Sequence, residues 1–433
     1  MSRIAVVGGG VAGLYAAWHL AADHGHDVTL FEAHGRPGGH ADTHRVQAPG
    51  MPAPIDVDTG FIVFNHRHYP HFSAWLDRLG VASHDSDMSF GISCEITGLE
   101  YNATSLNTLF CQRRNLVSPR FLGMVADIVK FYRSAPRLLE RLDDTVTLGD
   151  WLESPGAPGR AFAEDHLVPM ASALWSSPSS RVRQFPMRYL LEFMRNHDML
   201  QVEGRPQWRT VTGGSQRYVE AAVRTFAGAL RVDSPVRSVE RRDGQGVRLR
   251  LDDGEMDADH VLLACHADQA LALLGPSASA VERDVLRHFE YEDNDTVLHT
   301  DASRMPKHPA AWSAWTVRRD ADAAADGAPA GERASISYWM NRLQRLPDDV
   351  PLIVSLNQTD RIDPACILKR RAYRHPVYTP PMRRAQTRIG EIDGVDRVSF
   401  AGACWGWGFH EDAVRSAVRA IAGLETVSDH AAA

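Results

Sequence analysis

The chain has 433 residues, of which 44% are hydrophobic and 23% charged, and this composition excludes a disordered or fibrous protein. The formal net charge is −7, and the sequence carries neither a basic tail nor zinc-finger spacing, so we expect no nucleic-acid partner. No run of about 18 apolar residues occurs, which argues against a membrane span. At roughly 150 residues per domain, the length predicts two or three structural units.

The five cysteines, Cys94, Cys111, Cys265, Cys366 and Cys404, form no CxxC pair and are odd in number. In a chain of this length, such cysteines are expected to stay reduced, as thiols do in a cytoplasm. The first residues lead directly into an apolar stretch and lack the layout of a signal peptide. We therefore expect a cytoplasmic protein.

The amino-terminal stretch predicts a strand, a tight turn and a helix. Residues 4–7 are apolar, and a glycine-rich turn leads from them into helix-forming residues. Gly8 permits the tight turn, Gly10 allows a diphosphate to approach the backbone, and Gly13 allows the helix to pack on the strand. The helix amino terminus, at Val11 and Ala12, would face the phosphates with free N–H groups.

A second predicted strand, residues 28–31, ends in Glu32, which lies 19 positions after Gly13 (32 − 13). A carboxylate at this place accepts hydrogen bonds from both ribose hydroxyls and would repel a 2′-phosphate. Strand, turn, helix and acid together predict a dinucleotide with an unphosphorylated adenosine. A purely structural glycine turn is the alternative.

The next segments distinguish between the two common dinucleotides. Arg36-Pro37-Gly38-Gly39-His40 follows Glu32, and residues 55–61 read as a strand that ends in an Asp-x-Gly turn. Here the sequence resembles the flavoprotein superfamily of monoamine oxidases and phytoene-type desaturases. The resemblance implies FAD, and it implies that the following residues line the cofactor: Arg36, Gly38, Gly39, His40, Gly60 and Phe61.

The carboxyl-terminal stretch also resembles that flavoprotein superfamily. Residues 398–403 read as a buried strand, an aromatic and glycine-rich loop follows, and residues 414–421 have helical spacing. By that match Gly402 would lie near the ribityl phosphate, His410 and Ala413 at the flavin C2=O and N1, and Phe409 beside the ring. A helix amino terminus there would stabilise the negative charge of reduced flavin. The sequence departs from the family pattern at Asp412, where glycine is commoner.

The middle of the chain predicts how the domains are arranged. Residues 231–265 read as a small antiparallel section that returns to the nucleotide sheet, and the resemblance pairs the backbone of Val236 with adenine. We expect an α/β fold in which a discontinuous Rossmann-type FAD-binding domain carries an inserted α+β substrate domain. The FAD-binding domain would comprise residues 1–80, 205–275 and 376–433, and the substrate or cap domain residues 81–204 and 276–375.

No second dinucleotide fingerprint follows the first, which favours a flavin reduced by the substrate itself, with hydride passing from a C–H bond to flavin N5. Candidate catalytic residues for an accompanying proton transfer are Tyr69, His66, Asn341 and His375. Candidate substrate-contacting residues are Trp339, Trp405, Trp407 and Phe409. The histidines at 66, 68 and 71 lack zinc spacing on a helix, so no metal is expected.

More of the chain resembles one subgroup, the predicted NAD/FAD-binding flavoproteins found beside cyclopropane-fatty-acid-synthase-like methyltransferases. The matching stretches include residues 36–42, 58–69, 87–90, 205–209, 339–344 and 402–412. This resemblance implies dehydrogenation or desaturation of a lipid acyl chain. A flavin amine oxidase is the second reading, and a redox-neutral flavin isomerase or a flavoprotein without turnover is the third.

Residues 113–141 carry seven basic and two acidic side chains, a local charge of +5 in an acidic protein. This segment predicts an anionic partner such as a membrane surface, with which the protein would make peripheral contact. The solvated face of a cap helix is the alternative. The sequence gives no indication of the oligomeric state.

Overall fold

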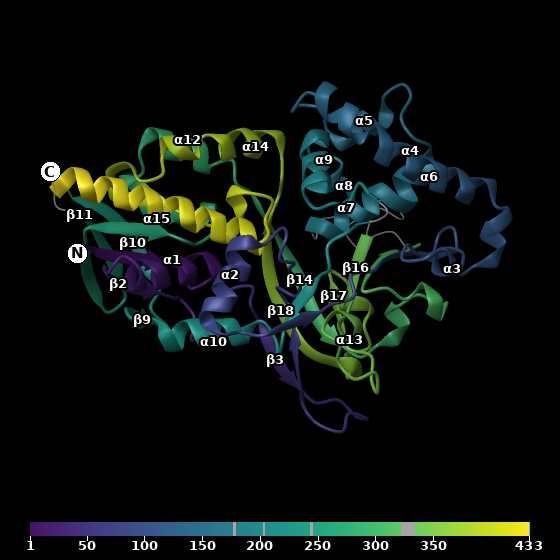
Figure 1. Ribbon diagram of the computed structural model, residues 1–433, viewed down its shortest axis with the longest axis horizontal. Helices are drawn as coiled ribbons and strands as arrows, with labels where there is room; N and C mark the ends of the chain where they lie inside the picture. The colour runs from purple at the N-terminus through teal and green to yellow at the C-terminus, as the bar shows by residue number, and fades with distance from the viewer. Residues whose placement is uncertain (176–178, 202–203, 243–245, 322–333, 433) are drawn as a thin grey trace.

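The computed structural model describes residues 1–175, 179–201, 204–242, 246–321 and 334–432. Two sheets organise the molecule, a parallel one and a larger mixed one, and helices cover both (Figure 1). The expected α/β class with a parallel nucleotide-binding sheet is confirmed. In the described part of the chain, no helix combines the length and the apolar character needed to cross a membrane.

The five-stranded sheet is parallel throughout and brings together three distant stretches of the chain. Its order is β19 (Val398–Phe400), β13 (His260–Leu263), β1 (Arg3–Val7), β2 (Asp27–Phe31) and β9 (Ala229–Arg231). The apolar run of β1 is buried on both faces, as a central parallel strand requires. The sheet therefore places the amino-terminal glycine turn beside the carboxyl ends of β13 and β19.

Each face of this sheet has its own core. Ile4 and Val6 pack under α1 (Val11–Ala22), α2 (Pro70–Leu79), α10 (Gln216–Thr225) and α15 (His410–Ala432). Ala5 and Val7 face the other core, which includes the antiparallel strands β10 (Val236–Arg242), β11 (Gly246–Leu251) and β12 (Gly254–Ala258). The same core contains residues of α11 (Ala267–Leu274), α12 (Ala280–Leu286) and α14 (Pro380–Thr387).

The seven-stranded sheet forms the second half of the molecule. Its order is β18 (Ile367–Pro376), β14 (Tyr291–His299), β17 (Ile353–Leu356), β16 (Ala334–Trp339), β15 (Trp315–Arg319), β6 (Phe90–Cys94) and β7 (Leu99–Asn102). Strand β18 runs between the two halves in Figure 1, so the sheet begins next to the nucleotide-binding half. Two short ribbons, β3 (Thr43–Val46) with β4 (Ile55–Asp58) and β5 (Ser83–Asp85) with β8 (Arg209–Val211), complete the strands.

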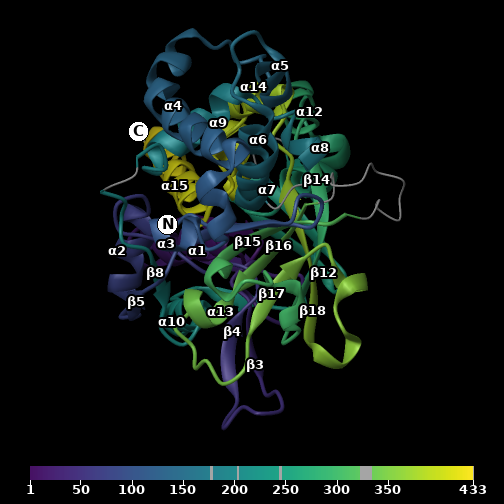
Figure 2. The same ribbon diagram turned by 90° about the vertical axis from the view of Figure 1, so that its right-hand side faces the viewer.

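A helical cap lies above this sheet in Figure 2, with the β3–β4 ribbon at the opposite end of the molecule. The cap comprises α3 (Leu106–Leu109), α4 (Pro119–Arg141), α5 (Leu148–Glu153), α6 (Arg160–Phe162), α7 (Val168–Trp175), α8 (Ser179–Val182) and α9 (Met187–Asn196). The short α13 (Met340–Leu343) follows β16. A π-helical turn, Ala163–Leu167, leads into α7, and such turns are frequent at functional sites.

Candidate active site

One cavity of about 1230 Å3 extends from the β1–α1 turn to the seven-stranded sheet. Pockets for one small ligand are usually about 300–1,000 Å3. The lining starts at the glycine turn, passes the carboxyl ends of β13 and β19, and continues between the mixed sheet and the cap. The volume therefore leaves room for a cofactor and a substrate together.

The glycine turn is shaped for a diphosphate. Gly8 has a φ of +111°, and a Cβ on Gly13 would stand 1.9 Å from the carbonyl oxygen of Gly8. A Cβ on Gly10 would meet no protein atom within 4 Å. Gly8 and Gly13 are thus required by the fold itself, whereas Gly10 leaves open space at the amino terminus of α1, where Val11 and Ala12 also line the cavity.

The adenosine end of the cavity lies beyond β2. Glu32 is buried, and its carboxylate accepts hydrogen bonds from the backbone N–H of Gly9 at 2.8 Å and of His34 at 2.9 Å. Val236, at the start of β10, lines the same end. An acid and an exposed backbone edge stand here together, as a ribose and an adenine require.

The second glycine pair lies against the first turn. Gly38 donates its N–H to the carbonyl of Gly9 at 2.8 Å, and Gly39 has a φ of +57°. A Cβ on Gly60 would stand 2.2 Å from the carbonyl oxygen of His40. Gly39, His40 and Gly60 line the cavity, whereas Gly38 and Arg36 lie behind it.

Arg36 has a different environment from the one the resemblance implies. Its guanidinium contacts the carboxylate of Asp42 and donates to Gln216 at 2.7 Å. Asp42 is fully buried and also accepts from Arg371 at 2.6 Å and from the Tyr373 hydroxyl at 2.8 Å. Because an ion pair holds it, Arg36 positions the glycine segment instead of lining the cavity.

The carboxyl-terminal helix points its amino end into the cavity. His410 begins α15, stacks on Phe61 with ring centroids 3.6 Å apart, and lies 3.1 Å from the Tyr218 hydroxyl through Nε2. Burial lowers the pKa of His410 well below its ordinary value, so the ring is neutral. Gly402 and Ala413 line the cavity beside it.

Asp412 stabilises the loop before this helix. Its carboxylate accepts from the N–H of Phe409 at 3.0 Å, and burial raises the pKa of the Asp412 carboxyl to about 7 despite this bond. Asp412 does not line the cavity, in agreement with its expected place as an amino-terminal helix residue.

Two buried nitrogens test whether a cofactor fits this half. Among the described residues, Nε2 of His40 and Nδ1 of His266 have no hydrogen-bond partner, although both side chains line the cavity. Buried polar atoms are nearly always satisfied, so these two lack a ligand that would pair with them. With the open space at Gly10 and the acid at Glu32, the residues present fit a dinucleotide that carries a polar ribityl-type chain.

The substrate half of the cavity has a sheet as its floor. Five successive strands contribute to it through Thr296, Leu356, Tyr338, Trp315 and Phe90, and residues 371–376 of β18 line the cavity beyond them, toward the cofactor half. The registers place Thr296 opposite Leu356, and Trp315 opposite both Tyr338 and Phe90. From β14 to β6 this floor spans four interstrand spacings of about 4.8 Å, or about 19 Å.

Aromatic side chains surround the cavity where it approaches the carboxyl-terminal loop. Phe409 stacks on Phe193 with centroids 5.1 Å apart, and Trp407 and Tyr378 line the same part. The loop keeps its shape because Trp175 donates through Nε1 to the carbonyl of Trp407 at 2.9 Å. These residues form an apolar enclosure in front of the α15 amino terminus.

The profile of the family described as flavin containing amine oxidoreductase matches residues 11–301. The chain belongs to this family. Family membership implies FAD as the cofactor, and the geometry of the glycine turns and of α15 fits it.

The L-amino-acid oxidase of Siganus canaliculatus is 25% identical over 332 residues, which cover 70% of this chain and 58% of that protein. The chain thus spans less than two thirds of the length of the first curated relatives it matches. Among solved structures, cyclohexylamine oxidase from Brevibacterium oxydans IH-35A has a TM-score of 0.70 at 17% identity, with 99% of each chain covered. A CLA-producing fatty acid isomerase from P. acnes has a TM-score of 0.63 at 15% identity, covering 97% of this chain and 98% of that one. At these identities the two structures show the fold alone, and the association with cyclopropane-fatty-acid-synthase-like proteins stays a prediction.

Two of the four candidate catalytic residues lie at the cavity. Tyr69 is buried, and burial raises the pKa of its hydroxyl far above the ordinary range. Nδ1 of His375 lies 2.9 Å from the side-chain nitrogen of Asn294. Burial, with nearby His40 and His266, lowers the pKa of His375 to about 3, so this imidazole is neutral.

The other two candidates lie elsewhere, which corrects the expectation for them. His66 is exposed and does not line the cavity. Asn341 is buried, and its amide binds the backbone: it donates to the carbonyl of Val350 at 3.0 Å and accepts from the N–H of Leu352 at 2.7 Å. Asn341 therefore holds the turn after β16 and has no amide group left for a substrate.

Of the four aromatic residues expected to contact the substrate, two line the cavity and two do not. Trp407 and Phe409 line the cavity, whereas Trp339 and Trp405 do not. Trp339 points away from the floor and packs on Trp312 with centroids 5.1 Å apart. Trp405 packs on Phe289 at 4.6 Å.

Sequence reasoning missed two histidines of the substrate half. His197 follows α9, and the centroid of its ring lies 5.6 Å from that of Phe409. Its Nδ1 lies within hydrogen-bond distance, 3.0 Å, of the Phe193 carbonyl oxygen. His166 lies in the π-helical turn, where Nδ1 is 3.1 Å from the Tyr101 hydroxyl and Nε2 has no hydrogen-bond partner among the residues that the structure describes. Burial lowers the pKa of both to about 4. In the sequence, both histidines stand beside stretches with apolar helical spacing. Histidines packed in a protein core have the same pattern, so it does not identify a site residue.

Proposed function

We propose that this chain is an FAD-dependent oxidoreductase that dehydrogenates or desaturates a lipid acyl chain. The observation that carries the proposal is the length and largely apolar lining of the cavity floor, about 19 Å across five strands. A small amine would fill only a fraction of that length, whereas an extended acyl chain would follow it. Membership of the flavin amine oxidoreductase family supports the redox class.

When bound, FAD supplies the hydride acceptor at N5. The residues of this chain bind the cofactor, orient the substrate and exclude water from the site. The positive end of the α15 dipole faces the site, which favours negative charge there. Phe193, Trp407 and Phe409 exclude water from the reacting end of the substrate. Tyr69 keeps its proton and acts as a neutral hydrogen-bond donor.

A flavin amine oxidase is the second candidate, because Tyr378, Trp407 and Phe409 supply aromatic walls that suit an amine. Against it, none of the three lysines, Lys130, Lys307 and Lys369, lines the cavity formed by the described residues. A redox-neutral isomerase and a flavoprotein without turnover are the remaining readings.

Anaerobic mixing of the FAD-loaded protein with a substrate panel tests the proposal. The panel contains long-chain fatty acids and their esters, primary amines and amino acids, and the readout is loss of the oxidised-flavin absorption. We expect bleaching by the acyl compounds alone. Bleaching by amines alone contradicts the proposal and favours the second candidate, and no bleaching by any compound contradicts both.

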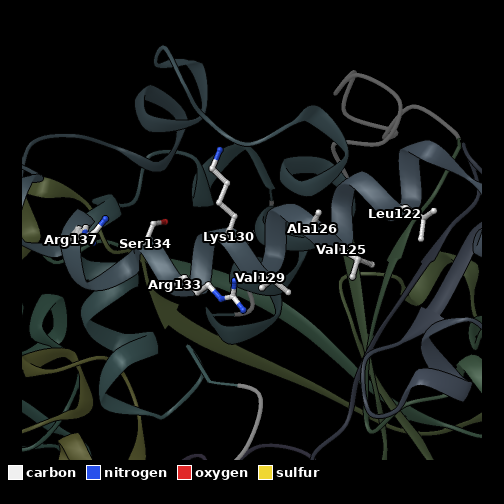
Figure 3. A pocket seen from close by; sticks show the side chains of 8 residues that line it. All are labelled: Leu122, Val125, Ala126, Val129, Lys130, Arg133, Ser134 and Arg137. Carbon is white, nitrogen blue, oxygen red and sulfur yellow. The ribbon is translucent and has the colours of Figure 1, made fainter.

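We further propose that the cap touches an anionic membrane surface through α4 and the turn before it. Five large hydrophobic residues between 106 and 129 are exposed: Leu106, Leu116, Val117, Leu122 and Val129. Figure 3 shows the exposed side of α4, where Leu122, Val125 and Val129 precede Lys130, Arg133 and Arg137 along the helix. An apolar strip with flanking cations suits a bilayer interface, where each basic side chain contributes about 1 kcal/mol.

Co-sedimentation with vesicles tests this contact. We expect binding to phosphatidylserine-containing vesicles and weak binding to phosphatidylcholine alone, with the former lost in Val117→Asp. Val395→Asp, at an exposed valine of the other half, is the matched control and should bind normally. Equal behaviour of the two variants would contradict the proposed surface. The five unpaired cysteines support the expected cytoplasmic side.

A further inference from the structure

The outer end of the substrate cavity holds a polar cluster that the proposed redox chemistry does not use. Arg205, Pro206, Gln207 and Trp208 all line the cavity; Arg205 is exposed at its rim, and the half-buried Tyr132 of α4 lines the cavity beside it. We propose that Arg205 and Tyr132 bind the carboxylate of an amphiphilic substrate whose chain runs inward along the sheet. This inference rests on the proposed function and specifies the substrate class as the free acid.

The guanidinium of Arg205 has donors to spare. Its Nε donates to the carbonyl of Gln201 at 2.9 Å, and it hydrogen-bonds the hydroxyl of Tyr132. Within the described residues, no carboxylate forms an ion pair with it. A guanidinium has five N–H donors in a planar fork that matches a carboxylate, so the arrangement can accept an anion without first losing a partner.

His166 supplies a third polar group at the same end. His166 lines the cavity, and its Nε2 has no hydrogen-bond partner in the part of the chain that the structure describes. After burial, the charge of Arg205 is the next cause that lowers the pKa of His166. An arriving anion would oppose that effect and favour the imidazolium form. His166 would then become a further donor to the carboxylate, with proton uptake on binding.

Most of the remaining lining of the substrate half is apolar. Trp315, Tyr338 and Leu356 form the floor, and Met170 and Leu174 of α7 lie on the cap side. Arg371 pairs with Asp42 at 2.6 Å and Arg374 with Asp268 at 2.9 Å, both toward the cofactor half. Charge available to a substrate is therefore confined to the rim, as a molecule with one ionised end requires.

In the described residues, one acidic side chain lines the substrate half of the cavity. Asp87 is exposed and follows β5, in the segment that leads to β6. It would favour a cationic head group, so the two rim residues predict opposite substrate charges. Arg205 has the support of Tyr132 and His166, and this favours the anion.

The experiment titrates the FAD-loaded protein with palmitate, methyl palmitate and hexadecylamine, and follows the perturbation of the flavin spectrum. In Arg205→Gln we expect palmitate to bind at least tenfold more weakly, since a hydrogen bond to a charged group is lost, and methyl palmitate to bind unchanged. Arg205→Lys should recover part of the loss. Asp87→Asn is the matched control and should not weaken palmitate binding, because it removes a negative charge from the same rim.

The inference would be overturned if Arg205→Gln weakened the binding of palmitate and of methyl palmitate equally, or weakened neither. It would also be overturned if the only loss of binding were that of hexadecylamine in Asp87→Asn. Proton uptake on palmitate binding, absent in His166→Gln, supports it through a second readout. If palmitate binds in an Arg205-dependent way but never bleaches the flavin, the proposed function fails and this inference stands. If acyl compounds bleach the flavin with no preference for the acid, the inference fails alone.

Discussion

Gly10→Ala separates the role of the first glycine turn in binding from its role in folding. Gly10 has a φ of −70°, which alanine adopts readily, and its Cβ would meet no protein atom within 4 Å. Alanine at this helix-capping position is disfavoured, but it also restricts the unfolded chain, so we expect the apoprotein to change by less than about 1 kcal/mol. The new methyl group would occupy the space into which the diphosphate must come.

The expected result is a folded apoprotein that has lost FAD affinity. FAD at 100 times its Kd should stabilise the wild type by about 2.7 kcal/mol, and this gain should be absent from the variant. Thermal unfolding with and without FAD, together with a titration of flavin fluorescence, measures both quantities.

Two further variants bracket this one. Gly13→Ala should prevent folding even of the apoprotein, because its Cβ would stand 1.9 Å from the carbonyl oxygen of Gly8. To lengthen this distance to 3.0 Å, α1 would have to move away from β1 by more than 1 Å. Gly123→Ala, on α4 with no atom within 4 Å, should leave FAD binding intact. If Gly10→Ala binds FAD as the wild type does, the diphosphate does not lie at this turn and the reasoning is refuted.

Three other outcomes are expected. Burial raises the native pKa of the Asp412 carboxyl to about 7, so the stability that the protonated carboxyl contributes is present below pH 4 and is lost as the pH rises through 7. The difference in unfolding free energy between the wild type and Asp412→Asn, measured by denaturant unfolding, should therefore change by up to about 4 kcal/mol over that window. Phe131→Ala, on the buried side of α4, should cost about 3–5 kcal/mol, whereas Val129→Ala on the exposed side should cost less than about 0.5 kcal/mol; equal costs would contradict the orientation of the helix. Tyr101→Phe removes the hydroxyl next to His166 and should destabilise by about 1–3 kcal/mol, and an unchanged midpoint of unfolding would contradict the assigned hydrogen bonds.

The cofactor half could be predicted from the sequence because its signals are local. Gly8, Gly13 and Glu32 act through backbone geometry within one strand–turn–helix unit, and their spacing alone determines where they lie. The α15 amino terminus was predictable for the same reason, since a loop with glycines followed by helical spacing fixes where the helix begins.

The substrate half could not be predicted in the same way. Strand β16 alternates between two faces, and the pattern does not say which face meets the cavity: Tyr338 does, whereas Trp339 lies on the other side. The sequence likewise does not show that the amide of Asn341, a candidate catalytic residue, binds the backbone of the turn after β16. His166 and His197 depend on how α7 and α9 pack over the sheet, which no spacing within either helix encodes.

Mass analysis of the acyl substrate after turnover by the FAD-loaded protein with an artificial electron acceptor tests the central claim most directly. The account predicts a product that has lost one pair of hydrogen atoms from its chain, with its head group intact. An acyl product of unchanged mass, or an untouched acyl chain beside a deaminated amine, would contradict it.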